Sequence, residues 1–267
     1  MTALRDVVYG AAVGDALGVP YEFKNRGSFE CTGMVSGGSH GQPAGTFSDD
    51  TSMMLATCDS IRACGRIDCA DMLERFRRWM KHGEYAIDGD VFDIGITTRQ
   101  ALYSGQGGAG ERDNGNGSLM RIAPLAFANA TPEEIREVSA ITHAHSISTE
   151  ACVTYVGVLQ QLAEGAPISA AVEGVEIGHR VFDPSAPESE IRSGGFVRDT
   201  LNAALWCLAN TDSYAQCVLA AVNLGRDTDT TACVAGALAG AAYGYDAIPA
   251  EWLEVLRGKD IIERCLF

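Results

Sequence analysis

The sequence offers no pattern of a disulfide-stabilised protein. Its nine cysteines are an odd number and include no CxxC pair. Several of them sit within apolar stretches of helical period. We interpret them as reduced thiols that act as small buried side chains, and the clearest examples are Cys58, Cys152, Cys207, Cys217 and Cys233.

Basic residues are scarce in this chain. It has 20 Lys and Arg against 35 Asp and Glu, which gives a formal net charge of −15. Proteins that bind nucleic acid need clustered Lys and Arg to neutralise phosphates. We therefore expect no nucleic acid partner.

Long hydrophobic runs are missing as well. The most apolar segment, residues 232–243, is mostly Ala and Gly. It is shorter than the ~20 residues that span a bilayer. The first residues show no basic stretch followed by a long apolar run, and acidic residues and glycines interrupt them. We expect a cytoplasmic protein without a membrane partner.

Alternating strand patterns are absent, whereas helical patterns with start and stop signals fill the chain. Residues 68–83 carry apolar side chains four positions apart and end on a glycine. In "TPEEIREVSAITHA", Thr131 can cap a helix, Pro132 suits its first position and Glu134 can close a capping box. The sequence therefore predicts an all-α protein.

Two stretches interrupt the helices, residues 104–118 and 182–195. Each is short and apolar helices resume on both sides, so neither is a domain linker. The "GQGGAG" within the first follows a helix-like segment instead of a strand, which excludes a dinucleotide-binding fingerprint. With 267 residues, 46% of them hydrophobic, we predict one domain over residues 1–267.

Two helix starts carry paired aspartates. Asp49 and Asp50 stand in "GTFSDDTSMM", and Asp227 and Asp229 stand in "GRDTDTTA". One carboxylate at a helix start stabilises by ~0.5–2 kcal/mol as a cap. A second carboxylate repels the first unless solvent or a cation neutralises it.

Carboxylates beside Ser and Thr hydroxyls suit Mg²⁺, Mn²⁺ or Ca²⁺ better than zinc. If the two starts converge, their four carboxylates could hold two metals roughly 3.5–4 Å apart. If they do not, the aspartates are separate helix caps. The spacing alone leaves both alternatives open.

Three further signals are weaker. Glu22 lies between Tyr21 and Phe23, where burial would raise its pKa for acid–base work, although a surface glutamate is an equally simple explanation. "NGNGSLMRIAPL" fits either a backbone-lined anion pocket with Arg121 beside it or a flexible loop. In "THAHS", His143 and His145 are either ligands or plain pocket residues.

Together these motifs resemble the ADP-ribosylglycohydrolase family. The matching stretches span residues 10–244 in the order of the family. The histidine stretch is the least specific of them, and the last stretch is the most specific. They are "GAAVGDALGVPYEF", "GTFSDDTSMML", "DIGITTRQAL", "NGNGSLMRIAPL", "ITHAH", "SGGFVRDTLNAALWCL" and "AVNLGRDTDTTACVAGALAGAAYG".

The resemblance implies an orthogonal helical bundle with two Mg²⁺ or Mn²⁺ ions in a cleft. It implies a hydrolase that releases ADP-ribose from a protein side chain or small molecule. One metal ligand departs from the family pattern, because a serine stands where many relatives have threonine, and it keeps the hydroxyl. The implied ligands are Ser48, Asp49, Asp50, Asp227, Asp229 and Thr230.

The resemblance also implies which residues act on the substrate. Glu22 is the first choice for proton transfer, and Asp93, in the family's D-x-G-x-T pattern, is an alternative or partner. Substrate contacts would come from a phosphate-proximal loop, the histidine of the T-H pair and a glycine–aromatic pair near the adenosine. These are Asn114, Gly115, Asn116, Gly117, His143, Gly195 and Phe196.

Two other functions fit the same motifs. A metal-dependent phosphohydrolase would use two metals and carboxylates equally well. A catalytically silent ADP-ribose-binding module would keep the pocket but lack turnover, and the intact ligand set with Glu22 argues against it. The acceptor (arginine, serine, a base or an ester), the native metal and the oligomeric state are not set by these motifs.

Overall fold

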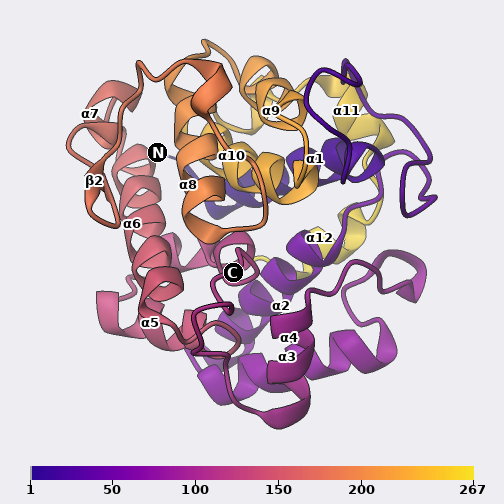
Figure 1. Cartoon of the computed structure of the whole chain (residues 1–267). Coiled ribbons are helices and arrows are strands. Elements are labelled where there is room, and N and C mark those ends of the chain that lie inside the picture. Colours follow the sequence, from indigo (N-terminus) through magenta and orange to yellow (C-terminus); the bar gives the residue numbers. More distant parts are fainter. Residues whose placement is uncertain (1) are drawn as a thin grey trace.

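The computed structural model describes residues 2–267, and they are helical almost throughout (Figure 1). Within these residues the only paired strands form a short antiparallel hairpin of β1 (Glu176–Ile177) and β2 (Arg180–Val181). The all-α prediction is therefore confirmed. The α-helices are α1 (Leu4–Gly18), α2 (Asp49–Cys64), α3 (Cys69–His82), α4 (Ile96–Ser104), α5 (Pro132–Ala140), α6 (Ser146–Ala163), α7 (Ile168–Val172), α8 (Val197–Ala209), α9 (Tyr214–Asn223), α10 (Thr228–Tyr243), α11 (Ala250–Val255) and α12 (Lys259–Cys265).

Local start and stop signals act as predicted. The carboxylate of Asp68 accepts hydrogen bonds from two backbone amides at the start of α3, which ends at Gly83 with φ 69°. Thr131 and Glu134 form the predicted capping box of α5. The helix-like segment from residue 93 begins as α4 only at Ile96, because Asp93 has a left-handed φ of 56°.

Helices α1 and α10 pack antiparallel with their backbones in contact. A Cβ atom on Gly14 would lie 2.0 Å from the carbonyl oxygen of Ala232, and one on Gly18 would lie 2.3 Å from Cα of Asp229. Only glycine permits this approach. The close contact sets the end of α1 directly against the start of α10.

Helix α10 is buried on all sides, from Thr228 to Ala241. Besides α1 it packs against α6, α8 and α9, and Figure 1 shows it in the interior of the molecule. A helix that is apolar all round belongs in the core. Its acidic first turn is therefore carried into the interior with it.

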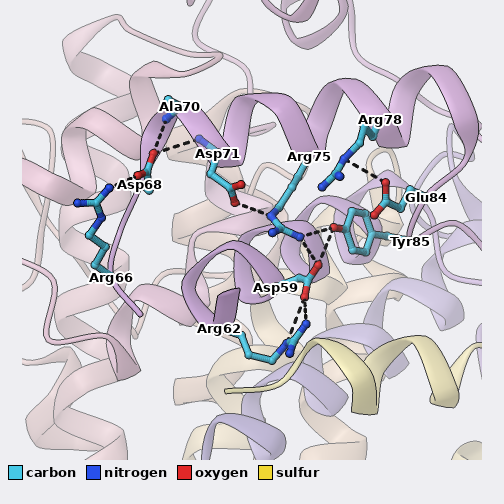
Figure 2. A network of polar contacts seen from close by, with 10 residues as sticks. All are labelled: Asp59, Arg62, Arg66, Asp68, Ala70, Asp71, Arg75, Arg78, Glu84 and Tyr85. Carbon is cyan, nitrogen blue, oxygen red and sulfur yellow. Dashed lines mark hydrogen bonds and ion pairs between the residues drawn. The ribbon is translucent and has the colours of Figure 1, made fainter. Parts of the chain in front are cut away.

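Helix α2 starts in the same region and runs toward the lower part of the view in Figure 1, where it packs against α3. Figure 2 shows the contact, in which the carboxylate of Asp59 accepts hydrogen bonds from Arg62, Arg75 and Tyr85. Arg75 also bonds to Asp71 on its own helix. These pairs, together with the apolar contacts between the helices, fix how α2 lies on α3.

The five cysteines named above are all buried as free thiols, in accord with the prediction for them. No helix within residues 2–267 combines the length and apolar character needed to cross a membrane.

Candidate active site

The two acidic helix starts converge. Carboxylate oxygens of Asp50, at the start of α2, and Asp229, in the first turn of α10, lie within 4.8 Å of each other and of an oxygen of Asp15. All three side chains are fully buried. We call Asp15, Asp50 and Asp229 the acidic centre.

Asp15 is the member that the sequence motifs did not assign. It extends from α1 to the start of α2, where it accepts hydrogen bonds from the backbone amides of Ser48 and Thr51 and from the Thr51 hydroxyl, the last at 2.6 Å. Burial raises its pKa to about 6, although these hydrogen bonds oppose the rise. The available signal was its position among the small residues of "GAAVGDALG".

Neither aspartate pair supplies an N-cap side-chain hydrogen bond to its helix, although Oδ1 of Asp229 accepts from the Thr230 amide within the first turn of α10. Ser48 is the N-cap of α2, and its hydroxyl accepts from the Asp50 amide. Asp227, at the N-cap position of α10, makes no capping hydrogen bond with its side chain. The interpretation as two separate helix caps therefore fails.

Among residues 2–267, two buried carboxylate oxygens find no hydrogen-bond partner, Oδ1 of Asp50 and Oδ2 of Asp229. Burial, followed by the charges of neighbouring carboxylates, raises the pKa of both groups well above its ordinary value. A buried oxygen without a partner is costly. A divalent cation would satisfy both oxygens, and the surrounding donors are the hard oxygen atoms that such cations prefer.

Hydroxyl and carboxylate groups around the acidic centre complete a possible cation site. The hydroxyl of Ser48 lies 2.9 Å from Oδ2 of Asp50, and that of Thr230 lies 3.4 Å from the same atom. Asp49 is 5% exposed and faces the adjoining pocket, as does Asp227. The structure thus gathers all the predicted ligands in one place.

A pocket of about 270 Å³ opens beside the acidic centre. Most of the predicted substrate and catalytic residues line it, together with residues 95–98 and Met120. Those predicted residues are Glu22, Asp93, Gly115, Asn116, Gly117, His143 and Gly195, and the predicted metal ligands Asp49, Asp227 and Thr230 line the pocket as well.

Glu22, His40 and Asp93 form a second cluster, in which one ligand atom of each side chain lies within 4.8 Å of the other two. Nε2 of His40 makes a hydrogen bond with Oε2 of Glu22 and lies 3.9 Å from Oδ1 of Asp93. His40 rests against the ring of Phe92, at 5.0 Å between centroids. Sequence analysis missed His40, which lies in a helix-free glycine-rich segment without a distinctive motif.

Glu22 is 4% exposed, which rules out the surface-glutamate alternative. Burial, followed by the charges of Asp93 and Asp227, raises its pKa to about 9. The raised pKa and its main cause, burial, agree with the prediction, although only Tyr21 of the two aromatic neighbours is buried and Phe23 is 63% exposed. Burial and the charge of Asp227 raise the pKa of Asp93 to about 7.

Hydrogen bonds anchor the glycine-rich loop. The Asn116 amide donates to the carbonyl of Gly195, and the Val197 amide donates to the carbonyl of Asn114. The side-chain amide of Asn116 donates to Oδ2 of Asp227 at 2.8 Å. The loop is thus tied to the start of α8 and to a predicted metal ligand.

Two predicted residues flank the pocket without lining it. The side-chain amide of Asn114 donates to the Glu111 carbonyl, and its oxygen accepts from Ser148. Phe196 is 40% exposed beside Gly195.

The two remaining cationic candidates have other roles. Arg121 was expected beside the anion pocket, but it is fully buried and donates to Thr142 and to the Val138 carbonyl. His145 caps α6 by accepting from the Ile147 amide, so it does not join His143 as a ligand. Both assignments needed side-chain directions that sequence spacing does not supply.

Comparison with known proteins is consistent over the whole chain. Residues 2–266 match the family model described as ADP-ribosylglycohydrolase. The ADP-ribosylarginine hydrolase Tri1 of Pseudomonas putida (strain GB-1) is 34% identical, over 97% of this chain and 76% of its own. The ADP-ribosyl-(dinitrogen reductase) glycohydrolase of Rhodospirillum rubrum is also 34% identical, over 94% and 88%. A solved structure described as an ADP-ribosylglycohydrolase-related protein complex matches with a TM-score of 0.82 and 33% identity, over 98% of this chain and 95% of that one.

Proposed function

Because this chain belongs to the ADP-ribosylglycohydrolase family, we propose that it removes ADP-ribose from arginine side chains of modified proteins with the help of divalent cations. The chain is a hydrolase of the ADP-ribose glycosidic bond. The arginine acceptor, the two Mg²⁺ or Mn²⁺ ions and the roles of individual residues are what we propose.

One observation carries the metal dependence. The unpartnered oxygens of Asp50 and Asp229 are buried directly beside a pocket that holds two further carboxyl groups, Glu22 and Asp93. The cations would be held by Ser48, Asp49, Asp50, Asp227, Asp229 and Thr230. When bound, such ions orient oxygen ligands and stabilise developing negative charge.

Glu22 is our candidate for proton transfer. Hydrolysis breaks the bond between the anomeric carbon and the acceptor nitrogen, adds the hydroxyl of water to that carbon and leaves the second water proton on the nitrogen. One carboxyl group that gives a proton to the leaving nitrogen and regains one from water suffices for this balance. The raised pKa of Glu22 favours the protonated starting form in the cation-free protein.

His40 and Asp93 would assist Glu22. The hydrogen bond between His40 and Glu22 holds the Glu22 carboxyl group in one orientation, so less reorganisation is needed at the reacting atom. Asp93 adds a second carboxyl group next to both Glu22 and His40. Carboxylates next to the anomeric carbon stabilise the positive charge of an oxocarbenium-like transition state.

The loop of residues 114–117 would bind the diphosphate. An acidic protein needs local NH donors for such an anion, and glycine lets backbone amides approach it closely. At Gly117 a Cβ atom would lie 2.8 Å from the ring of His143, so a larger residue does not fit there. Phe196 offers an exposed ring beside the pocket for the adenine.

Arginine as the acceptor is supported by two relatives that are named ADP-ribosylarginine hydrolases, the Tri1 proteins of Pseudomonas putida and Serratia proteamaculans. The pocket chemistry agrees. A guanidinium group is cationic, and the carboxyl groups of Glu22, Asp93 and Asp227 all lie around the pocket.

The test is hydrolysis of arginine-linked and serine-linked ADP-ribosyl peptides in parallel, with Mg²⁺, with Mn²⁺ and with chelator. We expect free ADP-ribose from the arginine peptide only, and loss of turnover with chelator. Release of AMP and ribose phosphate would indicate a phosphohydrolase instead. Binding of ADP-ribose without turnover under either metal would indicate a silent module, and equal turnover with chelator would refute the metal dependence.

A further inference from the structure

The two ring nitrogens of His143 have different surroundings. Its side chain lies against the glycine loop, where a Cβ atom on Gly115 would be 3.4 Å from Nε2. The Nε2 edge therefore faces the loop and the pocket that His143 lines. The other edge faces inward, with Nδ1 2.9 Å from the hydroxyl oxygen of Thr142. The two ring nitrogens thus have separate roles.

Hydrogen-bond donors decide which nitrogen carries the hydrogen. Nη2 of Arg121 also lies 2.9 Å from the Thr142 hydroxyl oxygen. A guanidinium group can only donate, so Thr142 accepts from Arg121 and has one hydrogen left to give. Thr142 is fully buried, and among residues 2–267 its hydroxyl has no acceptor other than Nδ1 of His143. A neutral imidazole that accepts at Nδ1 carries its hydrogen on Nε2.

Arg121 is an unusual group to find in this position. It is fully buried, and within residues 2–267 no carboxylate pairs with it. Its guanidinium lies 4.5 Å from the ring centroid of Phe76, and its Nε and Nη1 atoms have no hydrogen-bond partner. A buried charge of this kind is costly to maintain. Packing alone would favour an apolar side chain.

Burial and the same arginine keep His143 uncharged. Burial, followed by the positive charge of Arg121, lowers the pKa of His143 to about 3. The imidazole is then neutral throughout the range in which most enzymes work. It cannot act as a cationic anchor for the diphosphate.

We propose that Arg121 and Thr142 are positioning residues that hold His143 in the neutral tautomer with its hydrogen on Nε2, as an uncharged donor to an oxygen of the substrate. The relay runs from Arg121 through the Thr142 hydroxyl to Nδ1 of His143. The identity of that substrate, an ADP-ribosyl group, rests on the proposed function. The tautomer does not, because it is a property of the free protein.

The first test is the ¹⁵N NMR spectrum of the imidazole groups in the full-length free protein near neutral pH. The His143 signals are assigned by their loss in His143→Gln. We expect a protonated Nε2 and a bare Nδ1, retained in Thr142→Ser and replaced by a mixture of tautomers in Thr142→Val. A wild-type His143 with its hydrogen on Nδ1 overturns the relay, and so does an unchanged tautomer in Thr142→Val.

The second test is calorimetric affinity for ADP-ribose. We expect Thr142→Val to weaken binding by about 5- to 10-fold, the effect of one misdirected hydrogen bond, and Thr142→Ser to restore it. Thr57→Val is the matched control, because Thr57 is also fully buried but bonds only to the Met53 carbonyl. Weakening of the same size in the control would overturn the assignment. Should Thr142→Val not fold, the wild-type tautomer alone decides the outcome.

Discussion

Helix α2 carries aspartates at two places, the fully buried Asp50 and the partly buried Asp59, and their partners differ. At its start, Asp50 belongs to the acidic centre, where one of its oxygens has no partner. Further along, Asp59 accepts hydrogen bonds from Arg62, Arg75 and Tyr85 (Figure 2). The same residue type on the same helix is therefore left uncompensated in one place and fully paired in the other.

The pKa values of the two groups move in opposite directions. Burial, and then the charges of Asp15 and Asp227, raises the pKa of Asp50 well above its ordinary value. Burial also acts on Asp59, but hydrogen bonds from Arg62 and Tyr85 and the charge of Arg75 outweigh it and lower the pKa. Arginine side chains neutralise Asp59, which holds helices together. No arginine or lysine pairs with Asp50 within residues 2–267, and a metal cation from solution would complete that site.

The largest effect is expected from Asp229→Asn. The change removes one charge from the acidic centre at nearly constant shape, so activity should fall by more than ~100-fold. Metal-induced stabilisation should disappear too, while the chelated variant should be at least as stable as the chelated wild type, because less repulsion remains. Melting curves with Mg²⁺, Mn²⁺ and chelator measure this. If the Tm of the wild type does not change with metal, the proposed cation site is refuted.

Asp59→Asn is the matched control on α2. It leaves Arg75 with fewer partners at a largely buried position, so unfolding free energy should drop by about 1–3 kcal/mol. The drop should be the same with metal and with chelator, and kcat should stay near the wild-type value. A metal-dependent effect here would erase the distinction between the two groups of aspartates.

Glu22→Gln should give the next largest effect. Loss of a positioned acid–base group lowers turnover by ~100-fold or more, while the affinities for ADP-ribose and metal stay nearly unchanged. Calorimetry and a kinetic assay with the arginine-linked peptide separate the two. Unchanged turnover would move the role of Glu22 to Asp93.

Asn116→Asp should act more mildly. The side-chain amide that donates to Asp227 becomes a carboxylate, which repels that aspartate and any diphosphate beside the loop. We expect ADP-ribose binding to weaken on the order of 10-fold and to recover little with added metal. Unaltered affinity would show that this loop does not bind the diphosphate.

The smallest effect is a pH dependence of the chelated protein. Asp15, Asp93 and Glu22 have folded pKa values of about 6, 7 and 9, above their ordinary values. Their protonated forms therefore stabilise the folded state below about pH 4, and this stabilisation is lost as the pH rises through 6 to 9. Calorimetric scans should show Tm falling on the order of 5 °C over that range, and less with saturating metal.

Asp59 contributes the opposite dependence of Tm on pH in the same scans. Its lowered pKa stabilises the folded state above its ordinary value of 3.8, and this contribution is lost only in stronger acid. A chelated protein whose Tm instead rises from pH 5 to pH 8 would contradict the raised pKa values in the pocket.

Much of the fold could be predicted because its signals are local. Asp68 and Gly83 bound α3, and Thr131 with Glu134 starts α5, through contacts among residues close in sequence. The site was predicted less completely. Asp15 and His40 were not assigned, because each acts through a partner on another segment, Asp15 on the start of α2 and His40 on Glu22.

The sequence by itself determined the helices, the acidic character of two helix starts and the family motifs, since each is a matter of residue type and short-range spacing. Only the tertiary structure decided that Asp50 and Asp229 meet, that Glu22 is buried, and that the positive charge of Arg121 is turned away from the pocket. The backbone contact of α1 with α10, which Gly14 permits, brings Asp15 and Asp229 together in the acidic centre. Burial and charge proximity, and hence every raised pKa at the site, are properties of that packing and not of any single segment.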